Sequence, residues 1–147
     1  MDINQVNILL VDDDADDCNF FKDALMALPL STNLKILNNG EQLMYYLFEN
    51  MENLPDVIFL DINMPRKNGI ECLHEMKKNL LLKDLPVVMF STSNSQEKIG
   101  LVFKSGADVY IHKPSDFSQL KQVILHALPI AVENTFSNGS LKYILNA

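Results

Sequence analysis

The chain contains a short apolar run that leads directly into a single carboxylate. Residues 57–60, Val-Ile-Phe-Leu, stand between Asp56 and Asp61, and Pro65 and Gly69 follow soon afterwards. An apolar run of this length, rich in Val, Ile and Phe and bounded by turn residues, is typical of a strand buried on both faces. Such a strand favours a sheet that lies between layers of helices. Asp61 then stands at the end of a core strand, where it either begins a turn or serves a site.

Four other apolar runs of strand length occur along the chain, at residues 6–11, 34–37, 86–90 and 108–112. Between the runs, apolar residues recur every three or four positions, which is typical of one face of a helix. Helices are therefore predicted over about residues 15–28, 41–51, 70–80, 95–105 and 116–128. The candidate N-cap residues are Asp14, Ser93 or Ser95, and Ser115 or Asp116. Because five strands alternate with five helices, we expect an α/β fold with a parallel sheet covered on both sides.

Composition narrows the class of protein. The 147 residues suit one domain, and 48% hydrophobic with 21% charged residues is typical of a globular chain. A net charge of −7 argues against a nucleic-acid partner. Cys18 and Cys72 lack the spacing of a zinc site or a disulfide framework. The first residues, Met-Asp-Ile-Asn-Gln, do not show the basic region and apolar core that predict a signal peptide, and no apolar run approaches the roughly 20 residues that a membrane span needs. We therefore expect a cytoplasmic protein with no nucleic-acid or membrane partner.

Polar residues follow four of the predicted strands. Asp12 and Asp13 follow the first strand, Asp61 the third, Ser91 the fourth and Lys113 the fifth. Loops at the carboxyl ends of parallel strands form the ligand crevice of an open sheet, so these side chains are expected to meet. Clustered carboxylates repel one another and call for a cation, and oxygen ligands without His or Cys favour Mg²⁺.

These residue types suit the transfer of a phosphoryl group. A lone Asp beside such a metal acts as a nucleophile and forms an acyl phosphate, a role predicted for Asp61. Lys113 would neutralise a phosphoryl oxygen, and the Ser91 hydroxyl would donate a hydrogen bond to another.

Five ordered motifs resemble the receiver domain of two-component response regulators over about residues 5–128. The motifs are Leu-Val-Asp12-Asp13, Leu-Asp61-Ile-Asn-Met-Pro65, Phe-Ser91-Thr92, Gly106-Ala107-Asp108 and His-Lys113-Pro114. The resemblance implies a flavodoxin-like (βα)5 three-layer sandwich whose five-stranded parallel sheet has the order 2-1-3-4-5. We accordingly assign residues 1–128 to a receiver domain and residues 129–147 to a C-terminal tail.

The resemblance also implies roles for the site residues. Asp61 would be the phosphoacceptor, taking a phosphoryl group from a phosphohistidine of a sensor histidine kinase or a histidine phosphotransfer protein. The side chains of Asp13 and Asp61 and the backbone carbonyl of Asn63 would hold Mg²⁺, with Asp12 acting mainly through water. The protein would be a signalling phosphoacceptor with at most slow autodephosphorylation, and not an enzyme in the usual sense.

In the family, a conformational switch follows phosphorylation. The hydroxyl at Ser91 would move to the phosphoryl group, and Tyr110 on the fifth strand would turn inward behind it. The changed surface would comprise the fourth helix, fifth strand and fifth helix, roughly residues 95–128. The Lys113-Pro114 peptide bond is usually cis in this family.

The tail and the downstream partner are less constrained by the sequence. Pro129 disfavours continuation of the last helix, and a hairpin, a helical extension and a frayed tail remain alternatives for residues 129–147. No pattern of a DNA-binding or catalytic domain follows residue 128, so we expect a stand-alone receiver with an unknown downstream protein. The acidic run 12–17 and the loop 64–69 are similar to regulators that pair with phytochrome-type kinases. We also predict that residues 117–145 contribute to a homodimer.

Three other interpretations compete with a phosphoaccepting receiver. Asp12, Asp14 and Asp16 have the spacing of an EF-hand calcium loop, but the sixth position is not Gly and the twelfth is not Glu. Asp14, Asp16 and Asp17 are more simply helix-cap and solvated charges. A phosphatase with an Asp nucleophile would need a second Asp where Asn63 stands. A receiver-like scaffold without phosphorylation and a phosphorelay intermediate remain open.

Overall fold

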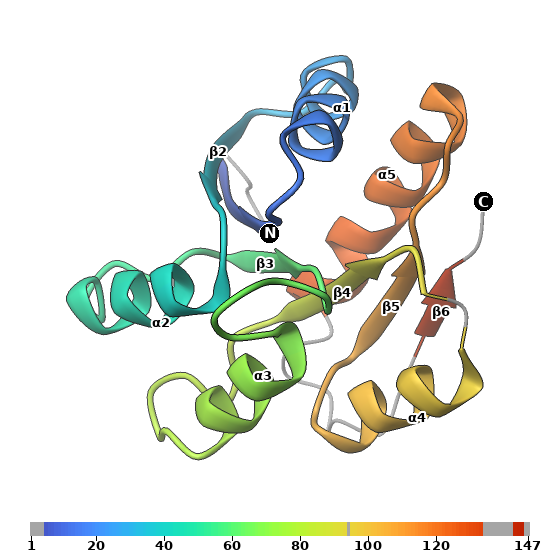
Figure 1. The fold of residues 1–147 in the computed structure, drawn as a ribbon. Coiled ribbons are helices and arrows are strands. Elements are labelled where there is room, and N and C mark those ends of the chain that lie inside the picture. The colour runs from blue at the N-terminus through green and yellow to red at the C-terminus, as the bar shows by residue number, and fades with distance from the viewer. Residues whose placement is uncertain (1–4, 94, 134–142, 146–147) are drawn as a thin grey trace.

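One parallel sheet forms the centre of the molecule (Figure 1). The computed structural model describes residues 5–93, 95–133 and 143–145. The strands, in spatial order, are β2 (Thr32–Leu37), β1 (Val6–Val11), β3 (Val57–Leu60), β4 (Val87–Ser91), β5 (Val109–His112) and β6 (Tyr143–Leu145). The helices are α1 (Ala15–Met26), α2 (Gly40–Glu49), α3 (Gly69–Lys77), α4 (Gln96–Lys104) and α5 (Phe117–Glu133). The predicted order 2-1-3-4-5 is confirmed, and β6 extends it beyond β5.

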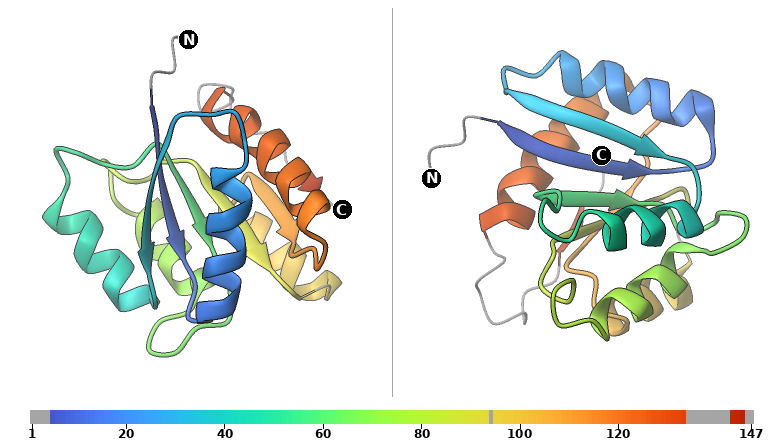
Figure 2. Two further views of the ribbon diagram at one scale, coloured as in Figure 1. Left: turned by 90° about the horizontal axis from the view of Figure 1, so that it is seen from above. Right: turned by 90° about the vertical axis from the view of Figure 1, so that its left-hand side faces the viewer.

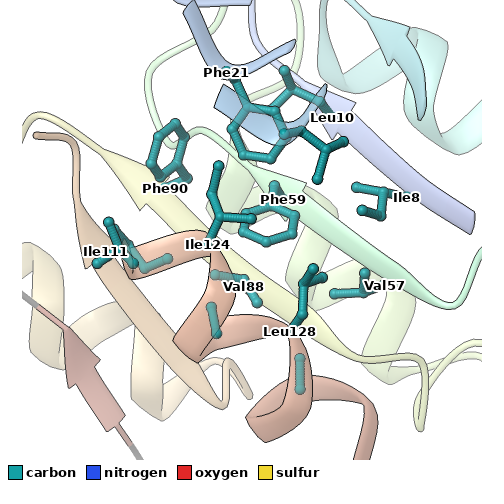
Figure 3. Close-up of a cluster of buried hydrophobic side chains, with 14 of the residues drawn as sticks. Ile8, Leu10, Phe21, Val57, Phe59, Val88, Phe90, Ile111, Ile124 and Leu128 are labelled. Atoms are coloured by element: carbon teal, nitrogen blue, oxygen red, sulfur yellow. The ribbon is translucent and has the colours of Figure 1, made fainter. Parts of the chain in front are cut away.

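Helices cover both faces of the sheet, as Figure 2 shows from two sides. Helices α1 and α5 pack on one face, where Phe21 meets Phe59 and Phe90 at ring-centroid distances of 5.0 and 5.6 Å (Figure 3). Helices α2, α3 and α4 pack on the other face around a second apolar cluster. The predicted three-layer α/β sandwich is therefore confirmed.

Strand β3 is buried along its whole length, as its apolar composition predicts. Val57 and Phe59 belong to the cluster under α1 and α5, and Ile58 and Leu60 belong to the opposite cluster. This alternation follows from the period of two in a strand. Asp61 therefore directly follows a strand that helices cover on both faces.

Side-chain caps fix where the helices begin after the strand-end loops. Asp14 accepts a hydrogen bond from the backbone N–H of Asp17 at the start of α1. Of the paired candidates, Ser95 caps α4 and Asp116 accepts from the backbone N–H of Gln119 in the first turn of α5. Capping of this kind satisfies N–H groups that have no partner within the helix.

Two predicted helix ends are wrong. The third helix was predicted to reach about residue 80, but α3 ends at Lys77 and Leu80 is 80% exposed. Helix α5 does not stop before Pro129, which lies inside it. Leu128 and Ala131 on either side of the proline are buried in the core, and this burial offsets the missing hydrogen bond. The boundary placed after residue 128 therefore falls within α5.

The tail combines two kinds of structure. Its first residues, up to Glu133, are a helical extension, one of the three alternatives for this segment. Strand β6, which was not predicted, pairs in parallel with β5, with Val109 opposite Tyr143 and Ile111 opposite Leu145. The turn expected at 137–139 lies outside the described residues.

Two expectations concern the backbone as a whole. Within the described ranges, none of the helices has the length and apolar character of a membrane span. All peptide bonds there are trans, so the Lys113-Pro114 bond differs from the cis form that is usual in the family.

Candidate functional site

Three carboxylates converge at the carboxyl end of the sheet. Strands β1 and β3 are neighbours with Val11 opposite Leu60, so the residues that follow them, Asp12 and Asp61, emerge side by side. Oxygen atoms of Asp12, Asp13 and Asp61 lie within 4.8 Å of one another. The side chain of Asp13 is exposed, whereas Asp12 is 1% and Asp61 7% exposed. The predicted cluster of Asp12, Asp13 and Asp61 is thus present.

Burial makes the negative charge at this point unfavourable. Burial raises the pKa of Asp61 to about 6; the nearby Lys113 charge opposes this shift and the carboxylates of Asp12 and Asp13 add to it. Burial likewise raises the pKa of Asp12, against the effect of its hydrogen bond from Lys113. A pair of buried carboxylates with raised pKa values favours a cation.

Lys113 is the cation that the chain itself supplies. Its side chain is only 8% exposed, and its ammonium lies 2.7 Å from Asp12 Oδ2 and 3.6 Å from Asp61 Oδ2. Burial lowers the pKa of Lys113, but the hydrogen bond to Asp12 and the charge of Asp61 outweigh burial and raise it overall. Lys113 therefore stays protonated beside both carboxylates.

A fourth carboxylate, which the sequence did not indicate, also binds Lys113. Asp17 Oδ2 in the first turn of α1 accepts a hydrogen bond from the ammonium at 2.9 Å. Asp17 is partly solvated, as predicted, with its side chain 40% exposed, but its pairing with Lys113 was not expected; Asp14 is the cap that was expected. The contact joins the first turn of α1 to the residue after β5, 96 positions away in the chain, and local sequence does not encode such a tertiary relation.

The backbone fixes one oxygen of Asp61. Asp61 Oδ1 accepts the N–H of Ile62 at 2.8 Å, while Oδ2 is the atom that faces Lys113. Behind the residue, Gly69 at the start of α3 donates its N–H to the carbonyl of Ile62 at 2.9 Å. A Cβ atom at position 69 would overlap the backbone carbonyl oxygen of Asp61. Gly69 thus supports the backbone of Asp61, whereas the sequence alone indicates only a turn at this position.

Ser91 on β4 stands opposite His112, and Tyr110 on β5 stands opposite Met89, so the two residues are diagonal neighbours in the sheet; both are fully buried. Ser91 ends β4, and its hydroxyl oxygen accepts the N–H of Ser93 at 3.2 Å. Tyr110 on β5 donates its hydroxyl to the carbonyl of Ser93, so both residues contact the same loop. Burial raises the pKa of the Tyr110 phenol, which therefore remains a neutral donor.

Asn63 stands at the exposed edge of the site. Its side-chain oxygen accepts a hydrogen bond from Lys98 of α4 at 3.3 Å. This contact links the loop after β3 to α4. The expected role of the Asn63 backbone carbonyl as a metal ligand stays a prediction.

Within the described residues, the EF-hand spacing of Asp12, Asp14 and Asp16 does not bring three carboxylates together. In the part of the chain that the structure describes, Asp12, Asp13 and Asp61 are the only group of carboxylate, His and Cys side chains that converges. Asp14 and Asp16 of the EF-hand spacing are not part of it. His74 contacts Ser105 Oγ, and His112 contacts the Thr92 carbonyl. The donor set of the converging group consists of oxygen atoms, which fits a hard divalent cation such as Mg²⁺.

Comparison with known proteins gives a consistent picture. The sequence model of the response regulator receiver domain family matches residues 8–125 of this chain. Response regulator Rcp1 of Synechocystis sp. is 31% identical over 122 residues, which are 80% of this chain and 82% of Rcp1. The probable C4-dicarboxylate response regulator DctR of Bacillus subtilis is 31% identical over 143 residues. That match covers 95% of this chain, which spans only 61% of DctR.

Solved structures show the same likeness. A phosphorylated cyanobacterial phytochrome response regulator, RcpA, is 30% identical with a TM-score of 0.78, covering 88% of this chain and 96% of RcpA. The Mn(2+)-bound form of Rcp1 is 29% identical with a TM-score of 0.76, covering 87% of this chain and 95% of that one.

Proposed function

The chain belongs to the family of response regulator receiver domains, and we propose that Asp61 accepts a phosphoryl group from a phosphohistidine. The donor would be a sensor histidine kinase or a histidine phosphotransfer protein. The observation that carries the proposal is the meeting of buried Asp61 with Asp12, Asp13 and Lys113 at one end of the sheet. The protein would serve as a signalling phosphoacceptor.

In the proposed step, an Asp61 oxygen forms a bond to phosphorus as the P–N bond of the phosphohistidine breaks. The electron pair of that bond goes to the imidazole nitrogen, and the product is an acyl phosphate. Lys113, already 3.6 Å from Asp61 Oδ2, stays protonated and neutralises a phosphoryl oxygen. Phosphoryl transfer depends mainly on such positioning and charge stabilisation.

Asp13 and Asp61 would hold Mg²⁺ with their side chains and Asn63 with its backbone carbonyl, while Asp12 would act mainly through water. When bound, the ion supplies positive charge to the carboxylates and to the incoming phosphoryl group. The proposal is supported by the oxygen-only donor set and by the raised pKa of Asp61. It is also supported by the Mn(2+)-bound form of the similar protein Rcp1.

Ser91 and Tyr110 would transmit the effect of phosphorylation to the surface of the protein. The Ser91 hydroxyl would bond to the phosphoryl group, and Tyr110 would follow it, altering the surface formed by α4, β5 and α5. The contacts of both residues with the Ser93 backbone support a route through this loop, and Tyr110 is already buried before any phosphorylation. In such a switch the new charge biases an element that has two arrangements.

An Asp-based phosphatase and a passive scaffold are the competing functions. Asn63 lacks the carboxylate that the phosphatase would use as acid or base, which favours a phosphate that persists on Asp61. A scaffold would have no need of the buried carboxylates that converge beside Lys113.

Incubation with a small phosphodonor and Mg²⁺ tests the function. The wild-type protein is expected to gain one phosphoryl group, detected by intact mass, and to lose it in hydroxylamine. Asp61→Asn should gain none, because the amide oxygen is a poor nucleophile. An unmodified wild type would leave the scaffold, and rapid turnover of generic phosphoesters would favour the phosphatase.

The identity of the phosphoryl donor and of the other partners is also a proposal. Likeness to the phytochrome response regulator RcpA supports a phytochrome-type kinase as the donor. We also propose a cytoplasmic location, an unknown downstream protein or a further phosphorelay step, and a homodimer to which residues 117–145 contribute.

Truncation after Glu133 tests whether the tail contributes to the homodimer, because it leaves α5 whole. If the full chain dimerises, an unchanged sedimentation profile after truncation rules out a role for residues 134–147.

A further inference from the structure

The ammonium of Lys113 is bound away from the proposed phosphoacceptor. It donates hydrogen bonds to Asp12 Oδ2 at 2.7 Å and to Asp17 Oδ2 at 2.9 Å, whereas Asp61 Oδ2 lies 3.6 Å away. An ammonium has three N–H donors. Two of the three are therefore committed to carboxylates other than Asp61.

Local structure explains why Asp17 is free to reach Lys113. An acidic residue three positions after the N-cap often bonds back to the cap N–H, as Glu71 does to Asn68 in α3. In α1 the corresponding residues are Asp14 and Asp17, but the N–H of Asp14 donates to Asp12 Oδ1 at 3.0 Å. The Asp17 carboxylate is therefore left to bind Lys113.

The two carboxylates that bind Lys113 differ in how easily they release it. Asp12 is 1% exposed and loses its buried cation if Lys113 departs, which leaves an uncompensated charge. The Asp17 side chain is 40% exposed, so water can replace the ammonium. When Lys113 donates an N–H to a new phosphoryl oxygen, its contact with Asp17 should therefore break before its contact with Asp12.

We propose that Asp17 is a positioning residue that holds Lys113 back from Asp61 and so slows phosphorylation. The inference rests on the proposed function of Asp61. The Asp17–Lys113 bond exists before transfer and is given up as Lys113 turns to the phosphoryl group. An interaction that stabilises only the starting state raises the barrier to the reaction.

Asp17→Asn tests the inference, with Asp16→Asn as the matched control. Asp16 lies in the same first turn, carries the same charge and is exposed, and among the described residues it is not a partner of Lys113. Relative to this control, Asp17→Asn should raise the rate constant for acyl phosphate formation about two- to fivefold at saturating phosphodonor and Mg²⁺. The half-saturating phosphodonor concentration should be the same in both variants, because Asp17 acts on Lys113 after the donor is bound.

Two further measurements separate positioning from a general structural effect. Asp17→Glu retains a carboxylate for Lys113 and should stay within about twofold of the wild-type rate constant. Calorimetric titration with Mg²⁺ alone should give the same affinity for Asp17→Asn and Asp16→Asn, since neither residue is a proposed ligand. A rate constant for Asp17→Asn equal to or below that of the control overturns the inference. Wild type that is not phosphorylated at all overturns the proposed function instead.

Discussion

At the scale of single residues, Asp61 is a charge placed where the fold disfavours it. It is 7% exposed, it lies beside two other carboxylates, and burial raises its pKa to about 6. Residues held in unfavourable electrostatic surroundings are frequent at functional sites. The ionised Asp61 side chain should therefore lower the free energy of unfolding.

Asp61→Asn should stabilise the metal-free protein at pH 7 by about 1–3 kcal/mol, because it removes a buried charge and its repulsion from Asp12. Urea denaturation without divalent cations measures the effect. Asp13→Asn is the control, since Asp13 is exposed and its replacement should change the free energy of unfolding by under about 0.5 kcal/mol. A less stable Asp61→Asn protein would contradict this account of the site.

The pH dependence of stability has a defined sign for the same group. The folded-state pKa of Asp61, about 6, lies above its ordinary value of 3.8, so the folded protein binds this proton more tightly. The contribution of Asp61 to stability is complete below about pH 3.8 and is lost as the pH rises through about 6. The stability difference between Asp61→Asn and wild type should therefore grow between pH 4 and pH 7. A difference that is constant over this range would show that the pKa is not raised.

Residue by residue, the sequence predicts the parts of the site that follow strands. The meeting of Asp12, Asp13, Asp61 and Lys113 is predictable because the carboxyl ends of parallel strands share one edge, whereas the role of Ser91 stays a prediction. The contact of Asp17 with Lys113 is not predictable, because it depends on how α1 packs.

At the scale of elements, the start of α3 supports the end of β3. Gly69 has no Cβ, and this lets its backbone approach the carbonyl of Asp61 and donate to the carbonyl of Ile62. The loop and the helix thereby hold Asp61 in place from behind.

Gly69→Ala should destabilise the protein by about 1–3 kcal/mol, because the added methyl group must displace the backbone of Asp61. Gly100→Ala in α4 provides the control. A Cβ there meets nothing within 4 Å, so the exchange should stabilise the helix by about 0.5–1 kcal/mol. Thermal unfolding of the two variants compares them directly, and equal shifts would contradict the close approach at Gly69.

Pro129→Ala should stabilise α5 by about 1–3 kcal/mol, since Pro129 lies inside the helix with an exposed side chain and lacks an N–H. Urea denaturation measures the gain. A loss of stability would mean that the proline ring contributes packing that outweighs the missing hydrogen bond. The helix end was mispredicted here because local propensity is overridden when residues beyond the proline are buried, as Ala131 is.

At the scale of the whole molecule, the parallel sheet brings distant residues to one point. Lys113 and Asp12 are 101 positions apart in the chain and 2.7 Å apart at the ammonium and carboxylate. The alternation of strands and helices predicts a parallel sheet covered on both faces, whereas the strand order followed only from the resemblance to receiver domains. Strand β6 is not predictable in the same way, because three residues that pair with the edge of β5 leave no periodic pattern.

The position of the phosphoryl group tests the central claim most directly. After phosphorylation in the presence of Mg²⁺, borohydride reduction converts an aspartyl phosphate to homoserine, and peptide mass spectrometry then locates the changed residue. The account predicts conversion at position 61 alone, with none at Asp12, Asp13 or Asp17 in the same crevice. Conversion at one of those three carboxylates with Asp61 unchanged would contradict it.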